Sequence, residues 1–185
     1  MEETTQVAVE TIAQVDVIRG KIHLPLDEFD EFEKLLLDNY SNKWSDYSTD
    51  TRNEDSYCPP SPIVDNILEE ITSVFYQVTN QKIVPAQYWG HIHEKNMSTR
   101  EHNHLNHYVS AILYVATPKG SGDLVFRPKL NHRYHGFGAT TLKPERGVYY
   151  IFPSYLDHYV TRNQSDEKRI SFSINFNKKE LTDEH

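Results

Sequence analysis

Three histidines in this sequence have the residue type and the spacing of metal ligands. His102 and His104 are separated by one residue, and an apolar, strand-like segment follows them at residues 110–115. Because alternate side chains of a strand share a face, both imidazoles can point the same way. His158 lies in a second strand-like stretch, at residues 149–160. Since neutral imidazole is the commonest metal ligand in proteins, these residues predict an open metal site. The alternative is that the histidines lie on polar outer faces of strands.

An arginine and a serine follow the last of these histidines and predict a site for an anion. Arg169 stands eleven residues after His158, and Ser171 follows at the spacing of one strand face. We expect a hairpin with its turn near residues 163–166, which would place Ser171 opposite His158. Arg169 would then stand opposite Val160, and all four side chains would share one interior face. A buried arginine needs an anionic partner, and its guanidinium can bind a carboxylate through two hydrogen bonds. The alternative is an exposed arginine after a charged turn.

Short apolar segments separated by turn residues fill the second half of the chain and predict strands. We expect these strands at residues 82–93, 108–117, 122–127, 147–153, 156–162 and 168–176. A further strand is expected at residues 15–24, where Pro25 ends it. Two helices with apolar stripes are expected between that strand and the others, one with Asp27 as its N-cap and one beginning at Ser61 and Pro62. The predicted fold class is therefore mainly β with N-terminal helices, as a helix-supported sandwich or barrel.

The composition is that of a folded protein with an acidic balance. The 185 residues are 37% hydrophobic and 12% aromatic, with a net charge of −8, and this length predicts one domain with a sizeable core. The negative charge argues against a general nucleic-acid binder, whose affinity comes from lysine and arginine. Cys58 is the only cysteine, which excludes an internal disulfide and predicts a reducing, cytoplasmic setting. We expect neither a signal peptide nor a membrane span, which needs about 18 consecutive apolar residues.

The order of these motifs resembles that of one enzyme family. The segments that carry the resemblance are His102-Asn103-His104, Ser110 to Val115, Gly122 to Phe126, Pro144 with Gly147, Ile151 to His158, and Arg169 to Phe176. Over residues 85–176 they are similar to the iron(II)- and 2-oxoglutarate-dependent oxygenases, and most like the short phage and bacterial branch of that superfamily. The resemblance implies a cupin-like double-stranded β-helix, or jelly roll, with helices packed on one sheet. The expected organisation is one oxygenase domain over residues 1–185, with a helical support region at 1–81 and the jelly-roll core with its metal site at 82–176.

The resemblance also implies which residues hold the metal. His102 and His158 correspond to iron ligands. Most of the superfamily carries an aspartate or glutamate two residues after the first histidine, which completes a triad with open positions for other ligands. This chain has His104 there, and the similar branch shares the His-x-His pattern, so we expect His104 to be the third ligand. The rival candidates are the carboxylates of Asp123 and Asp157.

A second group of residues is implied to bind the co-substrate. Arg169 and Ser171 correspond to residues that hold the distal carboxylate of 2-oxoglutarate. His93, on the strand-like segment 88–93, and Tyr114 are further candidates for the lining of this pocket. All four residues are therefore expected to surround one cofactor site.

The activity implied is that of a dioxygenase that uses Fe(II), 2-oxoglutarate and O2. Such an enzyme would hydroxylate its substrate and release succinate and CO2. The acidic balance favours a protein side chain or a small molecule over nucleic acid as substrate, and the basic segment at residues 131–138 is a candidate substrate lid. Two other classes stay open: a cupin-like metal-dependent enzyme that does not use 2-oxoglutarate, and a non-catalytic binding module whose histidines are surface residues.

Overall fold

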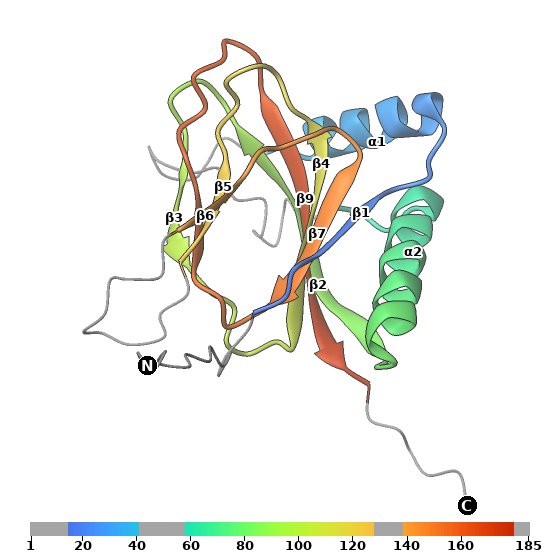
Figure 1. Cartoon of the computed structure of the whole chain (residues 1–185). Coiled ribbons are helices and arrows are strands. Elements are labelled where there is room, and N and C mark those ends of the chain that lie inside the picture. Colours follow the sequence, from blue (N-terminus) through green and yellow to red (C-terminus); the bar gives the residue numbers. More distant parts are fainter. Residues whose placement is uncertain (1–14, 41–57, 128–138, 180–185) are drawn as a thin grey trace, which may run out of the picture.

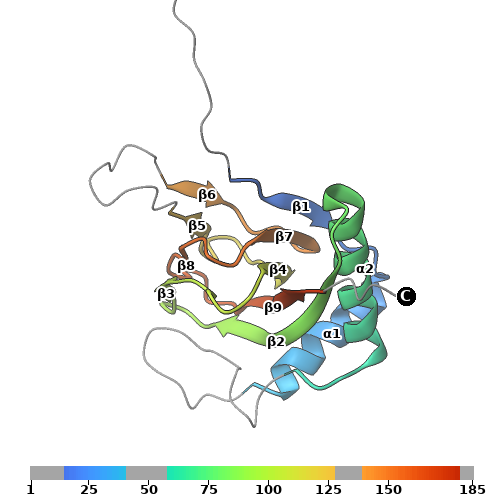
Figure 2. The same cartoon turned by 90° about the horizontal axis from the view of Figure 1, so that it is seen from below.

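The strands form two antiparallel sheets that face each other, and two helices cover the outer side of the larger sheet (Figures 1 and 2). This computed structural model describes residues 15–40, 58–127 and 139–179. In chain order the elements are β1 (Ile18–Lys21), α1 (Leu26–Asp38), α2 (Pro62–Thr79), β2 (Ile83–His93), β3 (Thr99–His102), β4 (Val109–Ala116), β5 (Leu124–Phe126), β6 (Thr140–Leu142), β7 (Val148–Pro153), β8 (His158–Val160) and β9 (Arg169–Lys178).

The strand order is that of a jelly roll. The larger sheet has the order β1-β7-β4-β9-β2, and the smaller sheet has the order β3-β8-β5-β6. Strands that follow each other in the chain thus often lie in different sheets, as in the double-sheet folds that close a barrel-like interior. The expected jelly-roll core is confirmed. The sequence reading missed only β3 and β6, which have four and three residues and little apolar pattern.

The helices pack against the larger sheet because each presents one apolar stripe to it. In α2 the predicted start is confirmed: the Ser61 hydroxyl accepts a hydrogen bond from the backbone N–H of Val64 at 3.3 Å, and Pro62 is the first helical residue. The prediction that Asp27 caps α1 is wrong, since this helix begins at Leu26 and no described side chain caps it. Buried residues of both helices and of the larger sheet form one continuous hydrophobic core.

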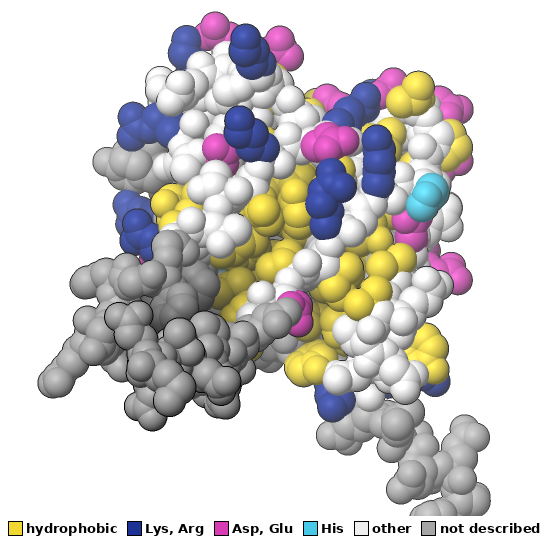
Figure 3. All heavy atoms as spheres, viewed as in Figure 1, with side chains coloured by type: hydrophobic (Ala, Val, Ile, Leu, Met, Phe, Trp, Pro, Cys, Tyr) yellow, Lys and Arg dark blue, Asp and Glu magenta, His cyan; other side chains and the backbone are white. Residues whose placement is uncertain are grey.

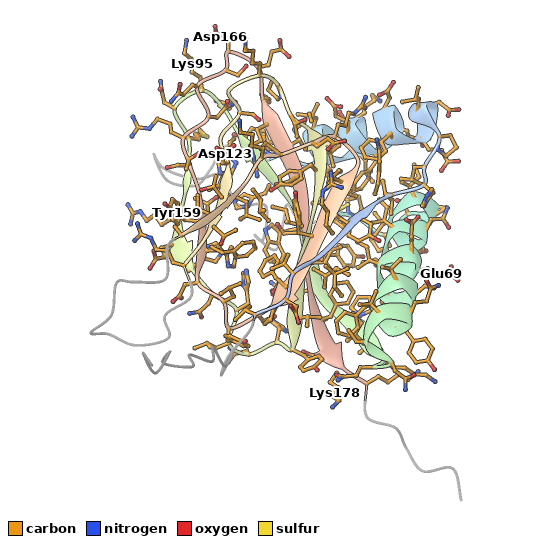
Figure 4. The ribbon with its side chains drawn as sticks, viewed as in Figure 1. Glu69, Lys95, Asp123, Tyr159, Asp166 and Lys178 are labelled. Atoms are coloured by element: carbon orange, nitrogen blue, oxygen red, sulfur yellow. The ribbon has the colours of Figure 1, made fainter. Side chains whose placement is uncertain are left out.

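The hairpin expected between the last two strands does not form. β8 pairs with β3 and β5 in the smaller sheet, whereas β9 pairs with β2 and β4 in the larger one. The connection crosses from one sheet to the other and is held by Asn163, whose buried amide donates to the carbonyls of His93 and Glu167. Because the chain crosses to the other sheet, β8 and β9 pair with strands that are distant in sequence and not with each other. The spacing between His158 and Ser171 therefore predicted the wrong strand partners. Tyr159 lies on the outer side of the smaller sheet (Figure 4), so its neighbours on β8 point inward.

The surface shows where charge and apolar groups gather. On the face in Figure 3, charged side chains crowd the end of the sandwich formed by the β2–β3 and β8–β9 connections, and hydrophobic side chains lie in the middle. Lys95 and Asp166 form an ion pair at that end, at 2.6 Å (Figure 4). No helix among the described residues has the length and apolarity that a membrane span requires. The candidate lid at residues 131–138 lies outside the described residues.

Candidate metal centre

The smaller sheet brings two of the three histidines side by side. His102 is the last residue of β3, His158 is the first of β8, and the two are register partners. His104 lies beyond the end of β3 rather than on it, and its backbone N–H donates to the carbonyl of Ser154 at 2.8 Å. One nitrogen of each ring lies within 4.8 Å of the other two. Since metal–imidazole bonds are about 2.0–2.1 Å long, small side-chain movements would let one cation reach all three rings.

Backbone carbonyls orient two of the rings. Nδ1 of His102 lies 2.8 Å from the carbonyl oxygen of Arg100, and Nδ1 of His158 lies 2.8 Å from that of Leu156. A carbonyl only accepts, so each Nδ1 carries the proton and each Nε2 keeps its lone pair. This arrangement fixes the tautomer and is the one in which metal-binding histidines are usually held. The Trp89 ring packs edge-on against His104, with ring centroids 5.8 Å apart.

The environment also keeps His158 in the neutral form that binds cations. Burial, with a smaller contribution from the nearby His102, lowers the pKa of His158 to about 4, although the Leu156 carbonyl and Asp157 oppose the shift. Phe126 and Phe152 pack around its ring, with centroids at 6.1 and 4.9 Å. Because a neutral imidazole needs no deprotonation before it binds a metal, the site is prepared for a cation near neutral pH.

Neither rival carboxylate joins the cluster within the part of the chain that the structure describes. Asp157 accepts a hydrogen bond from the side-chain amide of Asn103 at 2.7 Å. Asp123 precedes β5 (Figure 4), and its charge acts on Arg169 and Tyr114. The structure therefore brings together the three imidazoles expected from the sequence and leaves both carboxylates in other contacts.

Arg169 is the most unusual side chain in the interior. It is fully buried at the start of β9, and burial lowers its pKa, while Tyr114 and Asp123 oppose that shift. Its Nη1 donates to Ser171 Oγ at 3.1 Å and to His93 Nδ1 at 3.3 Å. Its Nε and Nη2 make no hydrogen bond of ordinary geometry with any described residue. These two groups form one edge of the guanidinium, the edge that binds a carboxylate through two parallel hydrogen bonds.

The remaining predicted cofactor residues surround this arginine. His93 is the register partner of Arg169 and Tyr114 that of Ser171, so β2 and β4 flank β9 on both sides. A guanidinium only donates, so Nδ1 of His93 accepts and its Nε2–H donates to Thr99 Oγ1 at 2.8 Å. Burial lowers the pKa of His93, and the nearby His91 and Arg169 lower it further. Burial raises the pKa of Tyr114 to about 12, against the influence of Arg169, whose guanidinium carbon lies 5.2 Å from the tyrosine ring centre.

A cavity of about 430 Å³ opens beside the three histidines. That volume lies in the range of about 300–1,000 Å³ that small-molecule sites occupy. The cavity walls include all three histidines, whereas Arg169, Ser171, Tyr114 and His93 are not among the lining residues. Sequence reasoning missed Ser110, Asn175 and Phe152 as cavity residues. For Asn175 the sequence did hold a signal: side chains alternate between the two faces of a strand, so residues 173 and 175 share a face with residues 169 and 171.

Comparison with known proteins shows which family and which solved structures this chain is similar to. Residues 87–175, close to half of the chain, match the model of the family described as "Putative 2OG-Fe(II) oxygenase". A search of the curated proteins gives no significant match. Among solved structures, a Pseudomonas putida prolyl-4-hydroxylase is 13% identical, with a TM-score of 0.63 over 89% of this chain and 93% of that one.

Two further solved structures are similar in the same way. HygX from Streptomyces hygroscopicus, solved with nickel and 2-oxoglutarate bound, is 13% identical, with a TM-score of 0.65 over 88% of this chain and 83% of its own. SnoK, an alpha-ketoglutarate-dependent carbocyclase from nogalamycin biosynthesis, is 10% identical, with a TM-score of 0.67 over 86% of this chain and 78% of its own. At these identities the likeness establishes the fold.

Proposed function

We propose that this chain is an iron(II)- and 2-oxoglutarate-dependent dioxygenase of the 2OG-Fe(II) oxygenase family, whose model matches residues 87–175. We assign His102, His104 and His158 as the iron ligands. Their nitrogens converge, and the carbonyl contacts at Nδ1 place the lone pair on Nε2 in the rings of His102 and His158. Three imidazoles fit a borderline cation such as iron(II), which binds nitrogen donors well.

The observation that carries the 2-oxoglutarate assignment is the unbonded edge of Arg169. A buried cation whose Nε and Nη2 lack acceptors among the described residues fits a bound carboxylate. Ser171 accepts from Arg169 and keeps its own hydroxyl proton, so it can donate a third hydrogen bond to the same carboxylate. A cupin-like enzyme without 2-oxoglutarate has no use for an arginine in this position.

The residues of the site would have different roles in the reaction. When bound, iron and 2-oxoglutarate supply the oxidation itself, in which O2 is consumed and 2-oxoglutarate becomes succinate and CO2. Arg169 and Ser171 would hold the far carboxylate. His93 would fix the rotation of Arg169, since it occupies Nη1 and turns the free edge away from itself. Phe126 and Phe152 around His158 would limit the access of water to the metal.

The domain organisation, the location and the substrate class are proposed from the core and the composition. One oxygenase domain fits the shared core of the helices and the larger sheet. A cytoplasmic location fits the single cysteine. A protein side chain or a small molecule fits the acidic chain better than a nucleic acid does. Hydroxylation is the reaction that we propose for that substrate.

The direct test is anaerobic titration of 2-oxoglutarate into the protein with and without iron(II), followed by admission of O2 and measurement of succinate. We expect binding of one molecule per chain, tighter with iron present, and iron-dependent succinate formation. His158→Ala should lose the iron, whereas His107→Ala, a histidine that bonds to Asn177 outside the cluster, should keep it. Bound iron without 2-oxoglutarate binding would favour the cupin-like enzyme. Absence of both would favour the binding module.

A further inference from the structure

A polar group on the cavity wall has no role in the metal or 2-oxoglutarate assignments. Asn175 is 1% exposed and lines the cavity beside the three histidines. Ser110, which is 2% exposed, is its register partner on β4 and lines the same cavity. Buried amides and hydroxyls are costly unless they are hydrogen-bonded, so the partners of this pair matter.

Hydrogen bonds within the protein leave the nitrogen of Asn175 available. Ser110 Oγ donates to Asn175 Oδ1 at 2.7 Å, and Ser110 Oγ lies 2.9 Å from Ser154 Oγ. Since Ser110 has one hydroxyl proton and gives it to Asn175, Ser154 is the donor in the second contact. The two N–H groups of Asn175 Nδ2 make no hydrogen bond to a described residue. Successive hydrogen bonds polarise one another, so this chain of hydroxyls strengthens the amide as a donor.

Distance along β9 separates Asn175 from the 2-oxoglutarate site. Arg169 and Asn175 are six residues apart on one strand, which corresponds to roughly 20 Å at about 3.3 Å per residue. A five-carbon diacid spans roughly 7 Å with bonds of about 1.5 Å. A molecule anchored at Arg169 therefore does not reach Asn175, and the amide is left for a different ligand.

The other cavity walls indicate what that ligand looks like. Apolar side chains make up much of the lining, among them Trp89, Ile112 and Phe152. None of the described lining residues is an aspartate or glutamate, so an ammonium group would find no charged partner. The walls favour an apolar body, and the free N–H groups favour an oxygen acceptor such as a carbonyl or carboxylate.

We propose that Asn175 binds the primary substrate through an oxygen acceptor, with Ser110 and Ser154 as positioning residues. The substrate class is a neutral or anionic molecule, or side chain, that joins a carbonyl or carboxylate to an apolar body. Ser154 connects this element to the metal, because its carbonyl accepts the backbone N–H of His104. The proposal rests on the proposed function, since the substrate must lie beside the iron.

The test compares three aromatic probes of similar size on the cobalt(II)-loaded protein with 2-oxoglutarate. Acetophenone carries a carbonyl, ethylbenzene carries no polar group, and benzylamine is a cationic donor. Cobalt shifts the NMR signals of a probe that binds beside it, so titration gives a Kd without turnover. We expect acetophenone to bind about fivefold more tightly than ethylbenzene, the effect of one neutral hydrogen bond, and benzylamine to bind most weakly.

Asn175→Asp is the decisive variant because it keeps the shape and the acceptor for Ser110 but replaces the two donors with a charge. We expect the preference for acetophenone to disappear and benzylamine to bind best. A variant that only damaged the structure would weaken all three probes equally. Ser110→Ala, which removes the group that orients the amide, should reduce the acetophenone preference without any gain for benzylamine. Asn66→Asp, an exposed residue of α2, is the matched control and should leave the order of the three probes unchanged.

The outcomes separate this inference from the proposed function. Calorimetry measures the Kd of 2-oxoglutarate for each protein, independently of the binding of the aromatic probes. Intact 2-oxoglutarate binding with an unchanged acetophenone preference in both Asn175→Asp and Ser110→Ala would overturn the role of Asn175. Tighter binding of benzylamine than of acetophenone to the unmodified protein would also overturn it. If the unmodified protein bound neither 2-oxoglutarate nor the metal, or only one of them, the proposed function would be overturned instead.

Discussion

The unbonded edge of Arg169 leads to a quantitative prediction. Arg169→Gln removes the charge and the two donors, Nε and Nη2, that have no acceptor among the described residues. Glutamine keeps a polar group beside Ser171 and His93, so part of the local hydrogen bonding survives. We expect this variant to fold and bind metal but to lose most of its affinity for 2-oxoglutarate.

The size of the loss follows from the number of charged hydrogen bonds. Each contributes about 1.5–3 kcal/mol, so two contribute about 3–6 kcal/mol, or roughly 10²- to 10⁴-fold in the Kd of 2-oxoglutarate. At about 100 times Kd, 2-oxoglutarate should add about 2.7 kcal/mol to the free energy of unfolding of the unmodified protein. For a chain of this size that corresponds to an increase in Tm of roughly 5–11 °C. At the same ligand concentration, the increase for Arg169→Gln should fall below about 2 °C.

Thermal unfolding of the cobalt(II)-loaded protein, with and without 2-oxoglutarate, measures this difference. Arg19→Gln is the control, because this arginine pairs with Glu145 on the surface at 2.8 Å and should keep the full increase in Tm. Arg169→Lys should be intermediate, since lysine keeps the charge without the planar pair of donors. The reasoning is refuted if Arg169→Gln binds metal and still gains at least half of the increase seen in the unmodified protein.

Three further predictions concern the metal, pH and thiol reactivity. His104→Ala should lose most of its bound iron, measured by metal analysis after dialysis, whereas Asp123→Asn should retain it; the reverse pattern would make the carboxylate the ligand. The depressed pKa of His93 means that the unfolded chain binds the proton more readily, so the free energy of unfolding should decrease as pH falls below the ordinary value of 6.5. His93→Gln should show a shallower decrease in denaturant titrations across that range, and an unchanged slope would contradict the assignment. Burial raises the pKa of Cys58 to about 12, so iodoacetamide at pH 8 should label the unfolded chain rapidly and the folded chain hardly at all, as mass spectrometry would show.

Local pattern predicted most of the fold because most of its strands are buried on at least one face. The segments that became β2, β4, β7 and β9 carry long apolar or alternating runs, and these are four of the five strands of the larger sheet. The strands β3 and β6 are short and largely polar, so nothing in their own residues distinguishes them from loops. The pairing of the strands was harder to predict than their existence. β8 and β9 are neighbours in sequence, but each buries its apolar side chains as part of a different sheet.

For the site, residue type and spacing located the histidines, but the structure was needed to see how they are held. The carbonyl contacts of His102 and His158 depend on backbone atoms two residues away, which no side-chain pattern records. The role of Asn175 depends on Ser110, 65 residues away in sequence. Ser110 and Asn175 meet because β4 and β9 pair within the larger sheet, and that pairing joins strands that are distant in sequence.

The location of the histidines at the smaller sheet has a consequence for the stability and abundance of the protein in a cell. β3 and β8 have four and three residues, whereas the larger sheet shares the continuous core of the helices. A cation bound by all three histidines would cross-link the ends of β3 and β8, and its binding energy would add to the stability of the smaller sheet. A shortage of iron would then affect the stability of the protein as well as its activity. It would loosen the smaller sheet, expose it to proteases, and make the abundance of the protein follow the supply of its metal.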